Sequence, residues 1–256
     1  MLALEFPKMY EILVWKNLFD GVGFNKIALI ACLATVLSSV LFILATRKET
    51  TEAPRGARNF AEVVVDFIEN SVIAQTMGSD KESMKWTPFL LTLFLFIYLC
   101  NVPGIIPFFQ MPATARMAVP MFLALLVWVV FNATGIKHQG VGGYFKSVLF
   151  PPGVPKALYI LVTPIELISV FLVRPFSLAV RLFANMLAGH ILLVTFALLS
   201  EALFQAKDKV LIPVGILPFF MLVFLTSFEV LVAFLQAYIF AMLAAVYISG
   251  AAHPEH

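Results

Sequence analysis

Three residues that could hold or move charge lie inside one apolar stretch, residues 174–194 (RPFSLAVRLFANMLAGHILLV). They are Arg181, Asn185 and His190, and Arg181 and Asn185 share a helix face because they are four residues apart. A charged guanidinium at membrane depth costs roughly 2.5–3.5 kcal/mol on insertion scales. Arginine does not release its proton at accessible pH, but it stabilises a nearby carboxylate in its ionised form. We therefore expect Arg181 to hold a carboxylate and not to relay protons.

A second polar group occurs in the last apolar stretch, where Glu229 and Gln236 share a helix face because they are seven residues apart. Two antiparallel helices joined near residue 207 would place Arg181 level with Gln236. The same register places His190 level with Glu229, to within two residues. His190 and Glu229 would then form a titratable pair suited to accepting and passing protons.

Two consequences follow from this register. Glu166 would lie level with residues near 252, at the opposite end of the hairpin from the turn. No acidic residue of the chain matches Arg181 in depth, so we expect the counter-charge of Arg181 to belong to another subunit.

Most of these residues also have an ordinary structural interpretation. His190 could be a helix-packing histidine, and Glu166 and Arg174 could extend their charged ends to the membrane surface. Asn185 and Gln236 could serve only as hydrogen-bonding groups between helices. Arg181 fits such an interpretation least, because no helix end is near it.

The composition is that of a membrane protein. The 256 residues are 61% hydrophobic and 12% charged, whereas a soluble domain has about 25% charged residues. The net charge of +2 is too small to indicate a nucleic-acid partner. Cys32 and Cys100 fall in apolar stretches, so we expect buried thiols, with no disulfide and no metal site.

We expect no cofactor: haem needs axial ligands within spans, and only His190 is available. An intramembrane protease signature is absent too, since all four Asp residues lie outside the apolar stretches.

The uncharged runs predict an all-α, multi-pass membrane protein that forms one domain over residues 1–256. After an N-terminal lead (1–26), we expect five transmembrane helices, at 27–46, 87–107, 117–137, 157–204 and 210–250. The last two are about twice as long as a perpendicular span. Each holds either two spans or one strongly tilted helix, and we favour a hairpin of two long tilted helices.

Residues 57–77 differ from the spans, because three carboxylates lie opposite an apolar face. An amphipathic helix at the membrane surface fits this pattern, and a solvated connector helix is the alternative. Nine of the 17 Lys and Arg residues fall in segments 47–86 and 137–156. The positive-inside rule therefore predicts an external N-terminus and a cytoplasmic C-terminus. Charged residues interrupt residues 1–21, so we expect no signal peptide.

Two segments resemble one known family. SLAVRLFANMLAGH is similar to the signature helix of subunit a of F-type ATP synthases, and FLQAYIFAMLAAVYIS resembles its last helix. The NVPGIIP turn, which contains Asn101, and the PIELIS segment, which contains Glu166, also fit. The resemblance implies a proton-translocating stator subunit in a bacterial cell membrane, which is not catalytic by itself. Its partners would be the rotating subunit c ring, the peripheral-stalk subunit b and membrane lipid.

The resemblance also implies a role for each polar residue. Arg181 would be the essential arginine that faces the ion-carrying carboxylate of the c ring, with Asn185 and Gln236 beside it. His190 and Glu229 would form the outer proton path, in exchanged positions relative to one common arrangement.

Two further positions complete the implied proton path. Asn101 would line the outer half-channel, although it could equally cap a broken helix. Glu166 would belong to the inner half-channel. A proton-coupled secondary transporter is the alternative function, but such proteins usually show an internal repeat or broken helices at the midplane, and neither is evident.

Overall fold

The computed structural model describes residues 26–46, 56–106, 112–150, 155, 158–205 and 212–252. This part of the chain is helical and contains no strand. Five of its helical segments are long and apolar enough to cross a membrane. The chain is therefore an all-α multi-pass membrane protein, as its composition predicts. The expected N-terminal lead, apart from Lys26, lies outside the described residues.

The helices follow one another along the chain with short connections. The long ones are α2 (Lys26–Thr46), α5 (Thr87–Asn101), α6 (Ala118–Leu149), α8 (Arg174–Phe204) and α9 (Ile216–Ala252). The shorter ones are α3 (Ala57–Ile68), α4 (Ala74–Thr76) and α7 (Tyr159–Ile168).

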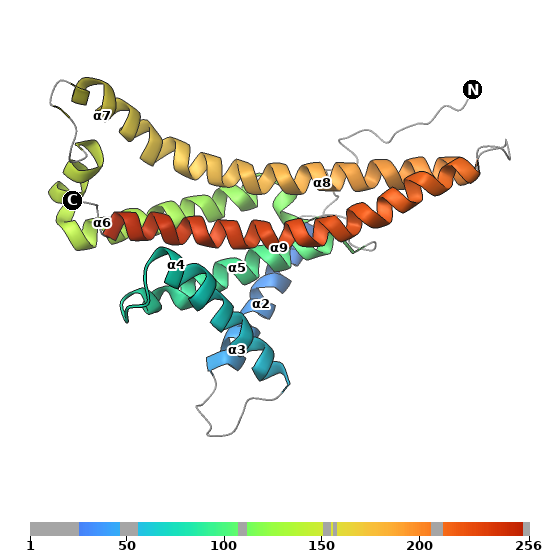
Figure 1. Ribbon diagram of the computed structural model, residues 1–256, viewed down its shortest axis with the longest axis horizontal. Helices are drawn as coiled ribbons and strands as arrows, with labels where there is room; N and C mark the ends of the chain where they lie inside the picture. The colour runs from blue at the N-terminus through green and yellow to red at the C-terminus, as the bar shows by residue number, and fades with distance from the viewer. Residues whose placement is uncertain are drawn as a thin grey trace, which may run out of the picture.

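The long stretch that the sequence left open is one continuous helical segment. A π-helical turn, Ser169–Val173, joins α7 to α8, so the helix runs without interruption from Tyr159 to Phe204. Figure 1 shows α8 running antiparallel to α9, with α7 bending away at the far end. The two helices form the expected hairpin. We call the end near Phe204 and Ile216 the turn end, and the opposite end the open end.

Two helices end at places other than those expected. The α-helix of the second span stops at Asn101 and continues as a 3₁₀ turn, Val102–Gly104, because a proline at position 103 has no backbone N–H and disfavours helix before it. The third span continues beyond residue 137 to Leu149. Its path breaks at Gly140, whose φ of 74° is accessible to glycine.

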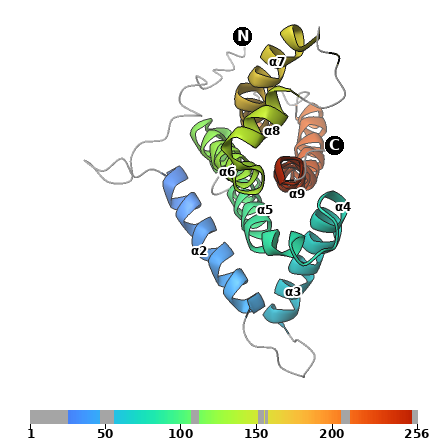
Figure 2. The same ribbon diagram turned by 90° about the vertical axis from the view of Figure 1, so that its left-hand side faces the viewer.

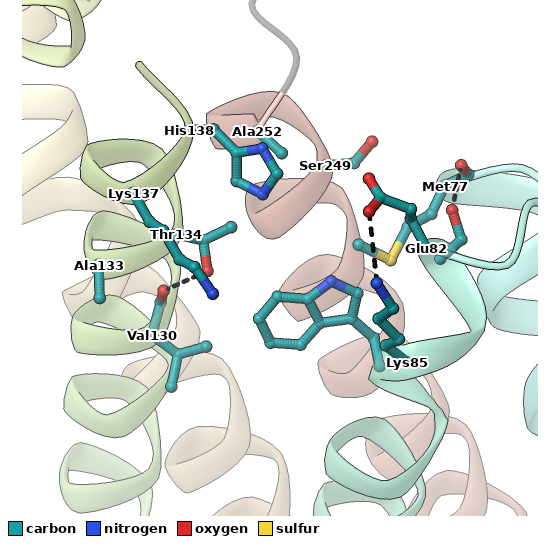
Figure 3. Close-up of a pocket in the computed structure, with 12 residues that line it drawn as sticks. Met77, Glu82, Lys85, Val130, Ala133, Thr134, Lys137, His138, Ser249 and Ala252 are labelled. Atoms are coloured by element: carbon teal, nitrogen blue, oxygen red, sulfur yellow. Dashed lines mark hydrogen bonds and ion pairs between the residues drawn. The ribbon is translucent and has the colours of Figure 1, made fainter. Parts of the chain in front are cut away.

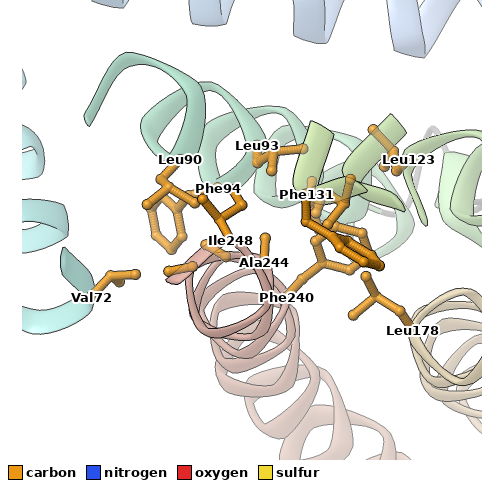
Figure 4. Close-up of a cluster of buried hydrophobic side chains, with 14 of the residues drawn as sticks. Val72, Leu90, Leu93, Phe94, Leu123, Phe131, Leu178, Phe240, Ala244 and Ile248 are labelled. Carbon is orange, nitrogen blue, oxygen red and sulfur yellow. The ribbon is translucent and has the colours of Figure 1, made fainter. Parts of the chain in front are cut away.

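Helix α9 occupies the centre of the bundle and contacts α5, α6 and α8. Its buried face is rich in small residues, and small side chains let membrane helices approach closely. Figure 4 shows larger side chains of α5 and α6, among them Phe94 and Phe131, gathered around Ala244 and Ile248 of α9. This packing holds the central helix in one register against its neighbours.

The amphipathic segment lies against this bundle. The two short helices α3 and α4 are joined by a π-helical turn, Glu69–Ile73, close to the predicted range of 57–77. The hydroxyl of Tyr238 on α9 donates a hydrogen bond to the carbonyl of Ser71 at 3.2 Å. At the other end of the segment Phe60 is 58% exposed. Figure 2 shows α2 and α3 meeting at one corner, away from α8 and α9.

Candidate functional site

The central layer of the site joins the two helices of the hairpin. The side-chain amide of Asn185 on α8 donates a hydrogen bond to the side-chain carbonyl of Gln236 on α9 at 2.7 Å. Gln236 is buried, and its Nε2 has no hydrogen-bond partner in the described part of the chain. Buried polar groups are nearly always paired, so this amide nitrogen requires a hydrogen-bond acceptor from elsewhere.

Arg181 lies one helical turn before Asn185 and is exposed on the surface of the bundle. The ion pairs Arg58–Glu62 and Lys85–Glu82 form elsewhere in the described part of the chain, and neither involves Arg181. The guanidinium therefore projects from an otherwise apolar helix without an acidic partner in that part of the chain. Such a charge is costly at membrane depth unless a neighbouring protein or water contacts it.

The titratable pair lies on the turn side of Arg181. His190 on α8 and Glu229 on α9 are both buried, with 3% and 6% of their surface exposed. Oε1 of Glu229 lies 2.6 Å from the position that a Cβ on Gly189 would occupy. Glu229 therefore packs against bare backbone of α8, and any side chain at position 189 would displace it. Its Oε2 has no hydrogen-bond partner in the described structure.

Asn101 is the last residue of α5. The hydroxyl of Thr114 donates a hydrogen bond to Oδ1 of Asn101, while Nδ2 of Asn101 is buried without a partner among the described residues. The adjacent Cys100 packs in one apolar cluster with Met186 of α8 and Ala233 of α9. Because Met186 and Ala233 are each one turn from His190 or Glu229, this cluster connects the end of α5 to the titratable pair.

A second polar group lies at the open end of the hairpin. Glu166 and Arg174 line a cavity of about 170 Å³, together with Gln139 and Ser147 of α6. The guanidinium of Arg174 lies over the ring of Tyr247, 5.4 Å from its centroid, which is a favourable cation–π distance. The side chains of Glu166 and Arg174 therefore line the same cavity at the open end of the bundle.

The structure adds residues to this group that the sequence reasoning missed. The register seen between Asn185 and Gln236 also brings Arg174 to Tyr247, whereas the register expected from the sequence placed Arg174 level with residue 243, about one helical turn away. The residues from α6 could not be found from any register of the hairpin. They reach the cavity because the helix continues past residue 137, with Gln139 bonded to the carbonyl of Ala251 at 2.8 Å.

The arrangement has three layers along the hairpin. The titratable pair lies on the turn side of Arg181, Arg181 with the amide pair lies in the middle, and the cavity lies at the open end. Arg174 and His190 are 16 residues apart on one helix, or about 24 Å at 1.5 Å per residue. Two separated polar regions with a fixed positive charge between them can conduct protons from each side without a direct connection.

The described residues contain no cluster of three or more His, Cys, Asp or Glu side chains that could hold a metal ion.

Comparison with known proteins identifies strong similarity to one family. The family model described as ATP synthase A chain matches residues 27–249. A protein of Frankia alni named ATP synthase subunit a is 41% identical over 96% of this chain and 86% of its own length. A protein of the same name from Rhodococcus erythropolis is 40% identical over 90% of this chain and 83% of its own length. One from Maricaulis maris is 38% identical over 97% of this chain and 96% of its own length.

Proposed function

The chain belongs to the ATP synthase A chain family, and from this premise we propose that it couples transmembrane proton flow to rotation of a subunit c ring. As a member of this family it is the membrane-embedded stator subunit of the complex. Two half-channels and one arginine would carry out the coupling. The family assignment favours this function over a secondary transporter.

One observation supports the proposal most strongly. Arg181 is exposed at mid-helix and has no acidic partner in the described part of the chain, although the helix around it is apolar. A guanidinium in that position is suited to face a carboxylate on a neighbouring membrane protein. We assign that carboxylate to the rotating c ring.

The outer half-channel would run through the titratable pair. His190 and Glu229 are buried on the turn side of Arg181, and the partnerless Nδ2 of Asn101 lies in the same region. A proton arriving from outside would pass through these groups to the rotor carboxylate. The neutral carboxyl group can then enter the lipid, since a membrane tolerates a neutral group far better than a charged one.

The inner half-channel would use the cavity at the open end. After rotation the rotor carboxyl group would meet the space lined by Glu166 and Arg174 and release its proton there. Arg181 cannot carry the proton across, so it would block a direct leak between the two paths. Each proton crossing 100 mV releases about 2.3 kcal/mol, so several are needed for one ATP.

The remaining assignments complete the proposal. We place the turn end of the hairpin and the N-terminus outside and the C-terminus in the cytoplasm, in a bacterial cell membrane. The peripheral-stalk subunit b would hold the chain against rotation, and lipid would cover the other apolar faces. The chain would supply the proton path without catalysing ATP formation itself.

The test is replacement of Arg181 by alanine in the assembled complex. We expect Arg181→Ala to abolish ATP-driven proton pumping and proton-driven ATP synthesis, measured in membrane vesicles with a pH-sensitive dye and by ATP formation. Arg116→Ala, which removes a charge in the connection just before α6, is the matched control and should leave coupling intact. Normal coupling in the Arg181→Ala complex would refute the proposal.

A further inference from the structure

A larger cavity lies at the open end of the bundle, between the start of α5, the middle of α6 and the end of α9. Its volume is about 630 Å³, and its lining includes Lys85, Trp86, Lys137, His138 and Ser249. Glu166 and Arg174 do not contribute to it, so it is separate from the cavity assigned to the proton path.

The cavity has positive charge on two sides. Figure 3 shows Lys137 on α6 and Lys85 before α5 on opposite sides of the space, with His138 at its edge. The lining contains one acidic residue, Glu82, whose carboxylate lies 3.3 Å from the ammonium group of Lys85. Both partners of this ion pair are more than 70% exposed, and exposed ion pairs are weak. An incoming anion can therefore compete for Lys85.

The position of these charges is that of a membrane surface. Lys137 ends the uncharged run of α6, and Lys85 directly precedes the uncharged run of α5. Trp86 lies between the charged Lys85 and the apolar helix α5. Tryptophan is enriched where the hydrocarbon region of a membrane meets the headgroups. The apolar residues Val130 and Ala133 line the side of the cavity that leads along α6 toward the membrane interior. The cavity thus combines a basic end with an apolar end.

We propose that this cavity binds the headgroup of an anionic phospholipid, with the phosphate held between Lys85 and Lys137 and the first part of the acyl chains against Trp86, Val130 and Ala133. Basic pockets between transmembrane helices at the membrane surface bind anionic headgroups in this manner. A lipid fits better than a soluble anion, because Val130 and Ala133 extend an apolar side of the lining toward the hydrocarbon region. The proposal does not depend on the proton path.

The occupant can be identified by crosslinking in the complete complex. Replacing Ala133, an exposed residue of the lining, by a photo-crosslinking amino acid should give an adduct with the mass of an anionic phospholipid. Nanodiscs that contain phosphatidylglycerol should give this adduct, and nanodiscs of phosphatidylcholine alone should not. An adduct with another protein subunit would overturn the proposal.

The role of the lysines can be tested by lipid retention. After mild delipidation of the complex, mass spectrometry should find about one fewer phosphatidylglycerol per subunit a in Lys85→Gln/Lys137→Gln than in the unmodified protein. Lys81→Gln removes an exposed charge nearby that does not line the cavity, and it should retain the lipid. Equal retention in all three proteins would refute the assignment.

Two further measurements separate a lipid from free phosphate and from misfolding. If inorganic phosphate in phosphatidylcholine nanodiscs raises the unfolding temperature as much as phosphatidylglycerol does, the site is a phosphate site and the proposal fails. If the double variant does not assemble, Lys137→Gln alone should lose retention and Lys137→Arg should keep it. Loss in both single variants would show that position 137 acts through packing and would overturn the proposal.

Discussion

The carboxyl group of Glu229 lies against the backbone of Gly189, with Oε1 only 2.6 Å from the position where a Cβ on that glycine would stand. The contact crosses the hairpin from α9 to α8, one residue before His190. A glycine at this position therefore allows the buried carboxyl group to approach the other helix. The contact between Gly189 and Glu229 therefore links the proposed proton path to the packing of the hairpin.

The first prediction concerns this contact. Gly189→Ala should push the carboxyl group of Glu229 away and slow proton pumping by about tenfold, which corresponds to about 1.4 kcal/mol. Pumping in membrane vesicles measures the effect. Gly142→Ala is the matched control, because a Cβ at Gly142 meets nothing within 4 Å.

A compensating change tests the cause of that loss. Glu229→Asp shortens the side chain by one methylene, so the pair Gly189→Ala/Glu229→Asp should pump faster than Gly189→Ala alone. No recovery in the double variant, or an equal loss in the Gly142→Ala control, would contradict the steric explanation.

The second prediction concerns the hydrogen bond between Asn185 and Gln236. Asn185→Leu should leave the buried carbonyl of Gln236 without a donor and lower the free energy of unfolding by about 1–3 kcal/mol. Asn185→Leu/Gln236→Leu should be less destabilised than the single variant, because both partners are then apolar. Denaturation of the reconstituted complex measures the difference. Simple addition of the two losses would contradict the assigned pairing.

The third prediction concerns the packing of α9. Ala241 is completely buried where α9 meets its neighbours, so Ala241→Leu should force the helices apart and cost about 1–3 kcal/mol. The thermal unfolding of the complex measures this cost. The Val246→Leu variant should unfold at the unchanged temperature, because Val246 is 44% exposed. An equal effect of both substitutions would show that the contact is not close-packed.

The fourth prediction concerns the cavity at the open end. In a protein in which Cys32 and Cys100 are replaced by serine, Ser147→Cys should react with a charged, membrane-impermeant thiol reagent. The reason is that Ser147 lines the polar cavity with Glu166. Labelling should come from the side on which Glu166 lies and should slow pumping.

The control for this labelling is Ser38→Cys, since Ser38 is buried on α2, with 4% of its surface exposed. It should stay unlabelled over the same time. Absence of labelling at position 147, or equal labelling at both positions, would show that water does not reach the cavity.

Much of the layered site follows from a single register. Two antiparallel helices joined near residue 207 place Gln236 level with Arg181, and in the structure Gln236 bonds Asn185, which lies one helical turn from Arg181 on the same face. The register also predicts that Glu166 lies level with the end of α9, and the cavity that Glu166 lines includes Gly250 and Ala251. Helical periodicity is sufficient to within about one turn, because the hairpin consists of two long, continuous helical segments.

Other features depend on where separate helices meet. Asn101 contacts Thr114 because the chain turns back after Gly104, and no periodicity predicts such a contact. The approach of Glu229 to Gly189 depends on the closeness of two helix backbones, which a sequence does not specify. The large cavity with Lys85 and Lys137 likewise forms between helices that are distant along the chain.

The sequence by itself determined that this chain is an all-α membrane protein with a costly arginine in its longest hairpin, because hydropathy and helical period are local properties. Only the tertiary structure decided which side chains of the other helices enclose each polar region. Their positions depend on the path of α6 past Gly140 and on the close packing of α9, which arise from contacts between distant segments. Local chemistry therefore predicts which residues matter, and long-range packing decides what each of them faces.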